Sequence, residues 1–143
     1  MMDENWDSIE VRAALPDDVP KLHQFIAPFV SQGKLLPRTL DELSELISTG
    51  FVAIADGTIV GFAALEIYSE KFSELRSLAV DPAYQGHGIG RRLVQACLDL
   101  AKQRNVFEVM AITSTEEFFR RCGFDFTLPG EKKALFLQTR DLY

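Results

Sequence analysis

The spacing of apolar residues predicts a strand and two helices in the first third of the chain. Residues 8–15 alternate between apolar and polar positions as a strand does, and Pro16-Asp17-Asp18 follows where a helix can begin. The next apolar residues have helical spacing: Val19, Leu22, Phe25, Ile26 and Phe29. Gly33 ends this helix. After a connector over residues 34–38, Thr39 is suited to N-cap a second helix through Ile47.

From Phe51 the apolar period changes to two, which predicts a sheet. Residues 51–55 and 58–68 form a predicted hairpin around the turn Asp56-Gly57. The later elements are a strand at 74–80, a helix at 88–104, a strand at 106–112, a helix at 115–121, a return from Gly123-Phe124 and a last strand at 134–139. The order βααβββαβαββ predicts a mixed α/β (α+β) fold.

Composition and charge narrow the class of protein. A chain of 143 residues with 47% hydrophobic residues suits one domain over residues 1–143. The formal net charge of −6 argues against nucleic-acid binding, which needs a basic face. No apolar run reaches the ~18 residues of a membrane span, and the acidic first residues are unlike a signal peptide. Cys97 and Cys122 lack metal-ligand spacing, so we expect structural thiols, no metal and a cytoplasmic location.

A glycine-rich turn at the start of the long helix carries the clearest chemical signal. Gly86, Gly88 and Gly90 alternate there, so backbone N–H groups can face an anion at a helix N-terminus. Arg91 and Arg92 follow in the first turn, where cations make sense beside an anionic ligand. The alternative is a plain surface turn. The spacing is not that of a dinucleotide-binding fingerprint, and no Walker lysine is present.

The run Gln85-Gly86-His87-Gly88-Ile89-Gly90 resembles the Gln/Arg-x-x-Gly-x-Gly/Ala signature of the GNAT acetyltransferases, and the preceding strand end and the late Gly123-Phe124 corner are also similar. The resemblance implies a central mixed, mostly antiparallel sheet flanked by helices, with acetyl-CoA as cosubstrate. It further implies that backbone groups of Gln85, Gly86, His87, Gly88, Ile89, Gly90 and Arg91 hold the pyrophosphate. Leu78, Ala79 and Val80 would pair with the pantetheine arm and polarise the thioester.

The proton-transfer residues depart from the common GNAT pattern. Phe119 stands where many members carry a Tyr that protonates the thiolate, so Thr115, Ser114 or water must serve, or the thiolate leaves unassisted. Glu74, a carboxylate on the central strand, is the candidate base, with an ordinary ion pair to Arg76 as the alternative. We expect His87 to be a solvated side chain, and His23 to be a surface or structural residue, rather than a base.

A narrower resemblance concerns the acceptor. Gly33-Lys34-Leu35-Leu36-Pro37-Arg38, the strand from Glu74 to Val80 and the threonine-rich stretch before Phe119 are similar to the acetyltransferase domain of N-acetylglutamate synthases. This implies L-glutamate as acceptor and a role in arginine biosynthesis, with Glu74 as base and Thr115 assisting the thiolate. Arginine suits bidentate recognition of carboxylates, so the substrate-binding candidates are Arg38, Arg140 and Arg76.

Two alternatives remain open at this stage. The first is a GNAT enzyme for another small amine or a protein amino group. The second is a non-catalytic acetyl-CoA-binding module that regulates a partner. The long synthases also carry a kinase-like domain that 143 residues cannot hold. We therefore expect a short stand-alone form, or one that works as a homodimer or beside a partner protein.

Overall fold

The computed structural model describes residues 6–126, 135, 137 and 139. Within these residues one sheet has five strands in the order β1 (Glu10–Ala13), β2 (Gly50–Ala55), β3 (Thr58–Ile67), β4 (Phe72–Val80) and β5 (Glu108–Met110). The helices are α1 (Val19–Ser31), α2 (Leu40–Leu46), α3 (Ile89–Gln103) and α4 (Glu116–Arg121). Short 3-10 turns are η1 (Trp6–Ser8), η2 (Pro16–Asp18), η3 (Ile47–Thr49) and η4 (Pro82–Tyr84).

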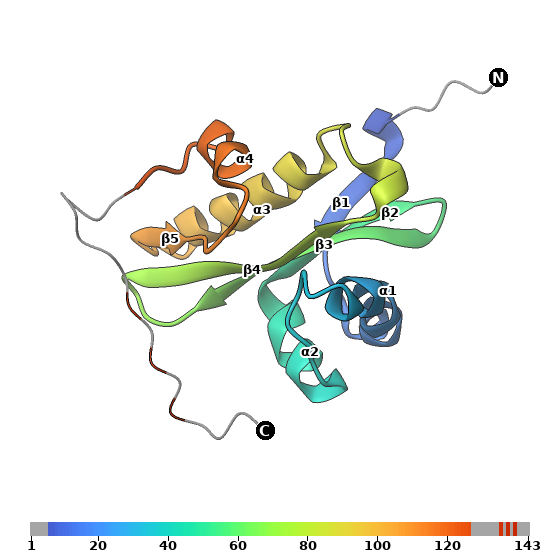
Figure 1. Cartoon of the computed structure of the whole chain (residues 1–143), viewed down its shortest axis with the longest axis horizontal. Helices are drawn as coiled ribbons and strands as arrows, with labels where there is room; N and C mark the ends of the chain where they lie inside the picture. The colour runs from blue at the N-terminus through green and yellow to red at the C-terminus, as the bar shows by residue number, and fades with distance from the viewer. Residues whose placement is uncertain (1–5, 127–134, 136, 138, 140–143) are drawn as a thin grey trace.

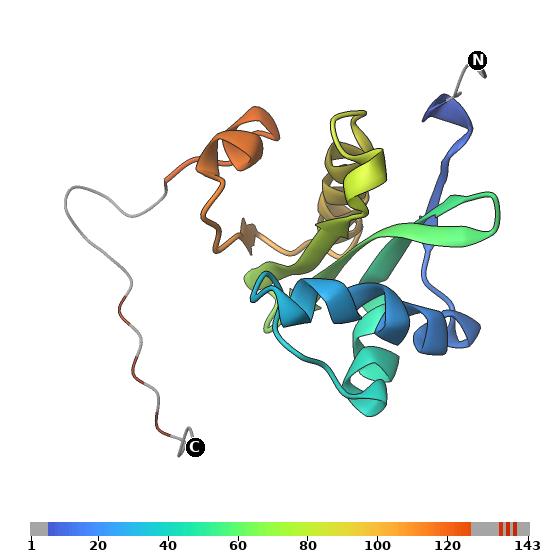
Figure 2. The same ribbon diagram turned by 45° about the vertical axis from the view of Figure 1, so that its right-hand side comes forward.

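The helices cover the two faces of the sheet. Helices α3 and α4 lie on one side and α1 and α2 on the other, as Figures 1 and 2 show. Two apolar clusters follow this division. Leu93 and Cys97 of α3 pack in one with Leu65, while Leu22 of α1 and Leu43 of α2 pack in the other. The alternation of strand side chains therefore fills both cores.

The sheet opens between β4 and β5. Strands β1 to β4 pair antiparallel, whereas β4 and β5 pair parallel over three residues only. The last of these pairs joins Glu74 to Met110. Beyond it, the remaining part of β4 has no strand beside its outer edge within the described residues, which leaves backbone groups free to bind a ligand.

A β-bulge shapes this open part of β4. Ala79 pairs with Phe62 and Arg76 with Ala64, so β4 holds one more residue than β3 between these two pairs. Ser77 absorbs the extra residue in the left-handed region, with φ 59°. A bulge raises the local twist and bends the strand. It thereby turns β4 near the point where β5 leaves it.

The predicted mixed α/β fold is confirmed, and the observed order follows the prediction through α4. Half of the predicted last strand at 134–139, residues 134, 136 and 138, lies outside the described residues, so this strand stays a prediction. The predicted strand at 106–112 is shorter, Glu108–Met110, because its pairing to β4 ends at Met110. Among the helices of the described residues, none is both long and apolar enough to cross a membrane.

Asp18, just before α1, links this helix to the end of β1 through hydrogen bonds. Its carboxylate accepts hydrogen bonds from Arg12 Nη1 at 2.8 Å and Nη2 at 3.0 Å, and from the Leu15 backbone N–H at 2.7 Å. The residue is 7% exposed. The hydrogen bond from Arg12 lowers the pKa of Asp18 against the opposing effect of burial. The bidentate pair therefore positions the first helix against the sheet.

We expect Asp18→Asn to lower the free energy of unfolding by about 2 kcal/mol, because hydrogen bonds to a buried charge are lost. Since the folded-state pKa of Asp18 is lowered, its contribution is full above the unfolded value of about 4 and is lost as the pH falls below it. Urea unfolding at several pH values should show the difference between wild type and variant shrinking in acid. Asp17→Asn, at an exposed neighbour, is the control. An equal loss in both variants would contradict this role.

Candidate functional site

The glycine-rich turn forms one wall of a hollow at the N-terminus of α3. Gly86 and Gly88 both have φ +83°, a left-handed conformation that disfavours any side chain, and Gly88 is the N-cap of the helix. The hollow has a volume of about 470 Å³. We call it the loop hollow; its lining residues are Val80, Tyr84, Gln85, Gly86, Gly88, Ile89, Gly90, Arg91, Phe118 and Arg121.

Two arginines give the loop hollow a positive charge. Arg91 comes from the first turn of α3 and Arg121 from the end of α4. The charges of both arginines reach the thiol of Cys122. Burial raises the pKa of Cys122, and the charges of Arg91 and Arg121 oppose that shift. Sequence reasoning missed Arg121, since only the fold brings α4 to the loop. Arg92 points elsewhere and donates to the Ile9 carbonyl at 2.7 Å.

The anion-binding turn, β4 and α4 meet at Gly90. A Cβ atom built there would lie 3.4 Å from Cζ of Phe118 and 3.7 Å from Cγ2 of Val80. These are ordinary van der Waals distances, so a methyl group would fit at position 90, whereas a larger side chain would compete with the Phe118 ring for space.

A second contact supports the loop from the N-terminal side. The Trp6 indole stacks on the His87 imidazole with centroids 3.5 Å apart and planes 6° apart, and it meets Tyr84 edge-on at 5.6 Å. His87 is not among the residues that line the loop hollow. Its imidazole is exposed and stacks on Trp6, on the N-terminal side of the loop.

The open edge of β4 faces the same space. The Val80 carbonyl accepts a hydrogen bond from Gln85 Nε2 at 2.9 Å, whereas the next N–H, that of Asp81, donates to Val60 of β3 at 2.8 Å. Alternation along the strand directs the N–H of Val80 outward with its carbonyl. Leu78 and Val80 are half-buried on the α3 side, and Ala79 is buried. These positions put the predicted pantetheine-binding segment beside the loop hollow.

Glu74 lies where the sheet opens, inside a group of four polar side chains. It is 8% exposed, and its Oε1 accepts a hydrogen bond from the Tyr68 hydroxyl at 2.7 Å. Arg76 Nη1 lies 3.5 Å from the same oxygen and 3.0 Å from Oε2 of Glu66. Glu66 and Glu74 are directly paired across β3 and β4, so Arg76 offsets the repulsion of two facing carboxylates. We call Glu66, Tyr68, Glu74 and Arg76 the β3–β4 cluster.

Tyr68 and Glu66 were missed by the reasoning from sequence. A signal for them exists, because Tyr68 follows Glu66 by two residues at the end of β3, as Arg76 follows Glu74 on β4, and this spacing places side chains on one face of a strand. Finding it requires the register that pairs Glu66 with Glu74. That register follows from the loop between the strands, which the period-two pattern does not define.

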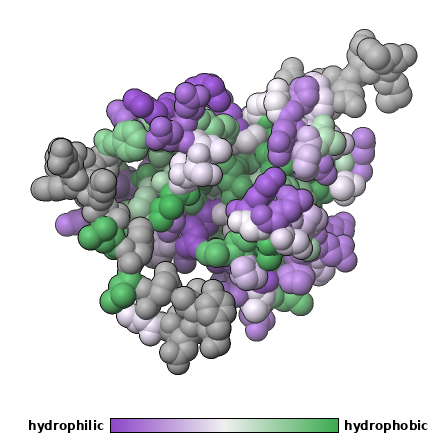
Figure 3. Space-filling view, viewed as in Figure 1, coloured by the Kyte–Doolittle hydropathy of each residue, from purple (hydrophilic) through white to green (hydrophobic). Residues whose placement is uncertain are grey.

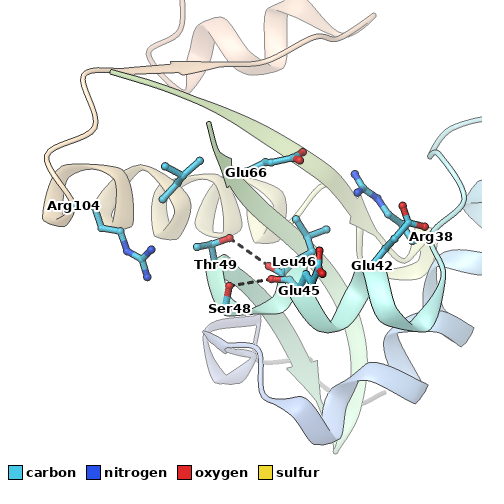
Figure 4. A pocket seen from close by; sticks show the side chains of 9 residues that line it. Arg38, Glu42, Glu45, Leu46, Ser48, Thr49, Glu66 and Arg104 are labelled. Carbon is cyan, nitrogen blue, oxygen red and sulfur yellow. Dashed lines mark hydrogen bonds between the residues drawn. The ribbon is translucent and has the colours of Figure 1, made fainter. Parts of the chain in front are cut away.

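Arg38 lines a second cavity, of about 400 Å³, next to the β3–β4 cluster. Its Nε atom is buried and has no hydrogen-bond partner within the described residues. Figure 4 shows Arg38, which precedes α2, and Glu66, on β3, reaching into this space from two sides. In the view of Figure 3, hydrophilic side chains lie at the bottom of a hollow near the middle of the molecule. We call the cavity that Arg38 lines the acceptor cavity; its lining residues are Arg38, Glu42, Glu45, Leu46, Ser48, Thr49, Glu66, Ile67 and Arg104.

The other predicted residues are not joined to this cluster. Thr115 is exposed, and its hydroxyl lies 2.9 Å from that of Thr113, which also accepts the Thr115 backbone N–H. No hydrogen bond links Thr115 to Glu74 within the described residues. Phe119 is 8% exposed and packs edge-on against Phe118 and Phe124, so it belongs to the core. Arg140 lies outside the described residues.

A sheet that opens beside a glycine-lined helix N-terminus defines a domain suited to a phosphate-bearing acyl carrier. The chain belongs to the Acetyltransferase (GNAT) family, whose pattern matches residues 17–124. The resemblance predicted from the glycine motif is thereby confirmed, and the chain is an N-acetyltransferase that uses acetyl-CoA.

Three proteins are similar to this chain over most of its length. An amino-acid acetyltransferase from Mycobacterium tuberculosis is 37% identical over 118 residues, covering 80% of this chain and 67% of that protein. A solved Mycobacterium tuberculosis structure, in complex with CoA and NLQ, has a TM-score of 0.76 and 34% identity, covering 87% of this chain and 76% of the other. N-acetylglutamate synthase from Neisseria gonorrhoeae, complexed with coenzyme A and N-acetyl-glutamate, has a TM-score of 0.73 and 31% identity. That match covers 83% of this chain but 28% of the synthase.

The residues present fit acetyl-CoA. The loop hollow offers free backbone N–H groups at the N-terminus of α3 and two guanidinium groups for phosphate oxygens. The outward N–H of Val80 is available to an extended chain such as pantetheine. Among the described residues no group of three or more His, Cys, Asp or Glu side chains could hold a metal ion.

We expect Gly88→Ala to weaken acetyl-CoA binding about tenfold. A side chain in the left-handed region costs about 1–2 kcal/mol, which the loop relieves by moving its N–H groups. Calorimetric titration with CoA measures the effect. Gly57→Ala is the matched control, because Gly57 also has a left-handed φ, +75°, but lies in the β2–β3 turn. Equal affinity in the two variants would contradict this role of the loop.

The chain's one tryptophan should report cofactor binding. Because Trp6 stacks on His87 in the loop, we expect a saturable change in its emission when CoA is added. In Gly88→Ala the change should shift to higher CoA concentration, and in His87→Ala the emission before titration should differ. Constant emission during a titration that calorimetry shows to be saturating would mean that Trp6 and the loop are not coupled.

Proposed function

We propose that the chain acetylates the α-amine of L-glutamate, as a cytoplasmic step toward arginine. The observation that carries this proposal is the combination of a buried carboxylate where the sheet opens, Glu74, and an adjacent cavity in which Arg38 presents a partly unpaired guanidinium. The similarity to amino-acid acetyltransferases supports the same substrate class.

In this proposal Glu74 removes a proton from the bound ammonium group. Its Oε1 is engaged by Tyr68 and Arg76, and its Oε2 has no partner within the described residues, so Oε2 is free to accept that proton. Acetyl-CoA supplies the activated acetyl group when bound. The outward N–H of Val80 can stabilise negative charge on the thioester oxygen. The hydroxyl pair of Thr113 and Thr115 can donate a proton to the departing thiolate.

Arg38 is the proposed partner of a substrate carboxylate. A guanidinium with a free donor matches the planar, bidentate geometry of a carboxylate. Arg76 is engaged by Glu66 and Glu74. We therefore assign it to holding the β3–β4 cluster, and Arg38 takes precedence over it in binding glutamate. Arg104, at the far side of the cavity, is a further cation for a second carboxylate.

A cationic amine is the second candidate acceptor, because the acceptor cavity holds three glutamates against two arginines. The Glu42 carboxylate already accepts a hydrogen bond from the Thr39 backbone N–H. This hydrogen bond lowers the pKa of Glu42 more than the charge of Arg38 does. Glu45 and Glu66 remain as carboxylates that could attract a polyamine or a basic side chain. A regulatory module that binds acetyl-CoA without turnover is the alternative of a different class.

A panel of amines with acetyl-CoA and a thiol-reactive dye tests the proposal. We expect thiol release that depends on L-glutamate, falls about 10²–10⁴-fold in Glu74→Gln, and shows a roughly 10–100-fold higher KM for glutamate in Arg38→Ala. Controls are Glu70→Gln and Lys34→Ala, which alter exposed charges on neighbouring loops.

Three other results would each point away from glutamate. Turnover with a polyamine but not with glutamate would favour the cationic acceptor and keep the acetyltransferase class. CoA binding without turnover of any amine would favour the regulatory module. A loss in Lys34→Ala equal to that in Arg38→Ala would remove the specific role of Arg38.

A further inference from the structure

Tyr68 has a hydrogen-bonding position that the reaction above leaves unused. Its hydroxyl lies 2.7 Å from Oε1 of Glu74, 3.3 Å from Oε2 of Glu66 and 3.3 Å from Nη1 of Arg76. It thus connects the two carboxylates of the β3–β4 cluster, as Arg76 Nη1 does, but through a hydroxyl that can both donate and accept a proton. Its ring is fixed by stacking on Phe72, with centroids 5.5 Å apart and planes 20° apart.

The two carboxylates differ in their access to water. The Glu74 side chain is 10% exposed, and that of Glu66 is 37% exposed and lines the acceptor cavity. A proton taken up by Glu74 therefore lies in a site with little contact with solvent, whereas a proton on Glu66 can pass directly to water. The hydroxyl between them bridges the interior and the surface.

Tyr68 remains a hydroxyl throughout the working range of an enzyme. Burial, with the hydrogen bond to Glu74 as the next cause, raises the pKa of Tyr68 to about 12. Tyr68 therefore keeps its proton below that pH and can both donate and accept a hydrogen bond. A group of this kind passes a proton on without holding an extra charge.

We propose that Tyr68 and Glu66 form the exit path for the proton that Glu74 takes from the acceptor amine. This inference rests on the proposed role of Glu74 as base. Rotation about the Cγ–Cδ bond of protonated Glu74 turns its O–H toward Tyr68. The Tyr68 oxygen then accepts that proton while its own proton passes to Oε2 of Glu66. Glu74 regains its charge, Tyr68 remains neutral, and Glu66 releases one proton to water.

The charged groups around Glu66 come from several elements. Arg76, on β4, contacts both carboxylates and lies closer to Glu66, at 3.0 Å against 3.5 Å. The other charged groups around the cavity that Glu66 lines are Arg38, before α2, Glu42 and Glu45 on α2, and Arg104 after α3. The direction of transfer follows from exposure, since of the two carboxylates Glu66 has the wider access to water.

Tyr68→Phe tests the path, because it keeps the ring that stacks on Phe72 and removes the hydroxyl. With the acceptor that the wild type uses best, we expect kcat to fall about tenfold or more while the KM for acetyl-CoA is unchanged. Imidazole, added as a small buffer base, should restore the rate as its concentration rises. Glu66→Gln should lower kcat in the same way, and Glu70→Gln should not.

The possible outcomes separate this inference from the proposed function. Absence of turnover in the wild type would remove both. If the wild type turns over, Glu74→Gln loses activity and Tyr68→Phe has an unchanged kcat, only the exit path would be removed. A slower Tyr68→Phe variant whose rate does not respond to imidazole would show that the hydroxyl has a structural role instead. Circular dichroism of each variant confirms that it is folded.

Discussion

The early end of pairing between β4 and β5 governs the arrangement of the whole site. Parallel strands need a crossover, and α3 supplies it, so its N-terminus lies beside the edge of β4 that β5 leaves uncovered. The same separation leaves Glu74 at the last paired position, buried yet next to open space. The edge that can hold the cofactor and the carboxylate proposed as base therefore lie along one strand, and a fully paired sheet would have used the backbone groups of that edge.

Much of the fold could be predicted because local chemistry and tertiary packing agree. The Asp56-Gly57 turn, the Thr39 cap and the apolar stripe of α3 each lead to the element that is observed. The prediction was less accurate where structure depends on distant pairing. The strand at β5 was expected to be longer, since its sequence is suitable over residues 106–112, but its partner diverges after Met110. The Ser77 bulge also has no local sign, since only Gly ordinarily marks a positive φ.

The candidate site, like the fold, could be predicted from the sequence only in part. Gly86, Gly88 and Arg91 were predicted because the loop is contiguous in sequence, and all three line the loop hollow. Arg121 and Tyr68 were not, because each joins its cluster through folding rather than through a motif. Arg92 and Phe119 show the opposite case. Their positions in the sequence suggest a role in the site, but in the structure Arg92 donates to the Ile9 carbonyl and Phe119 packs in the core. Residue type and spacing thus indicate the cofactor well, whereas the acceptor side depends on the register between β3 and β4.

The contact between Gly90 and Phe118 has a consequence for how relatives of this chain can diverge. A methyl group at position 90 would meet the ring at an ordinary contact distance, but a larger side chain would compete with the ring for the same space. Such a side chain would be accommodated best with a smaller residue at position 118, and the two positions should then change together. Since α4 carries Thr115 at its N-terminus, a paired change would also shift the hydroxyl proposed to assist the thiolate. The binding of the cofactor and the proposed leaving-group assistance could thereby be adjusted in one step, without a change in the acceptor cavity.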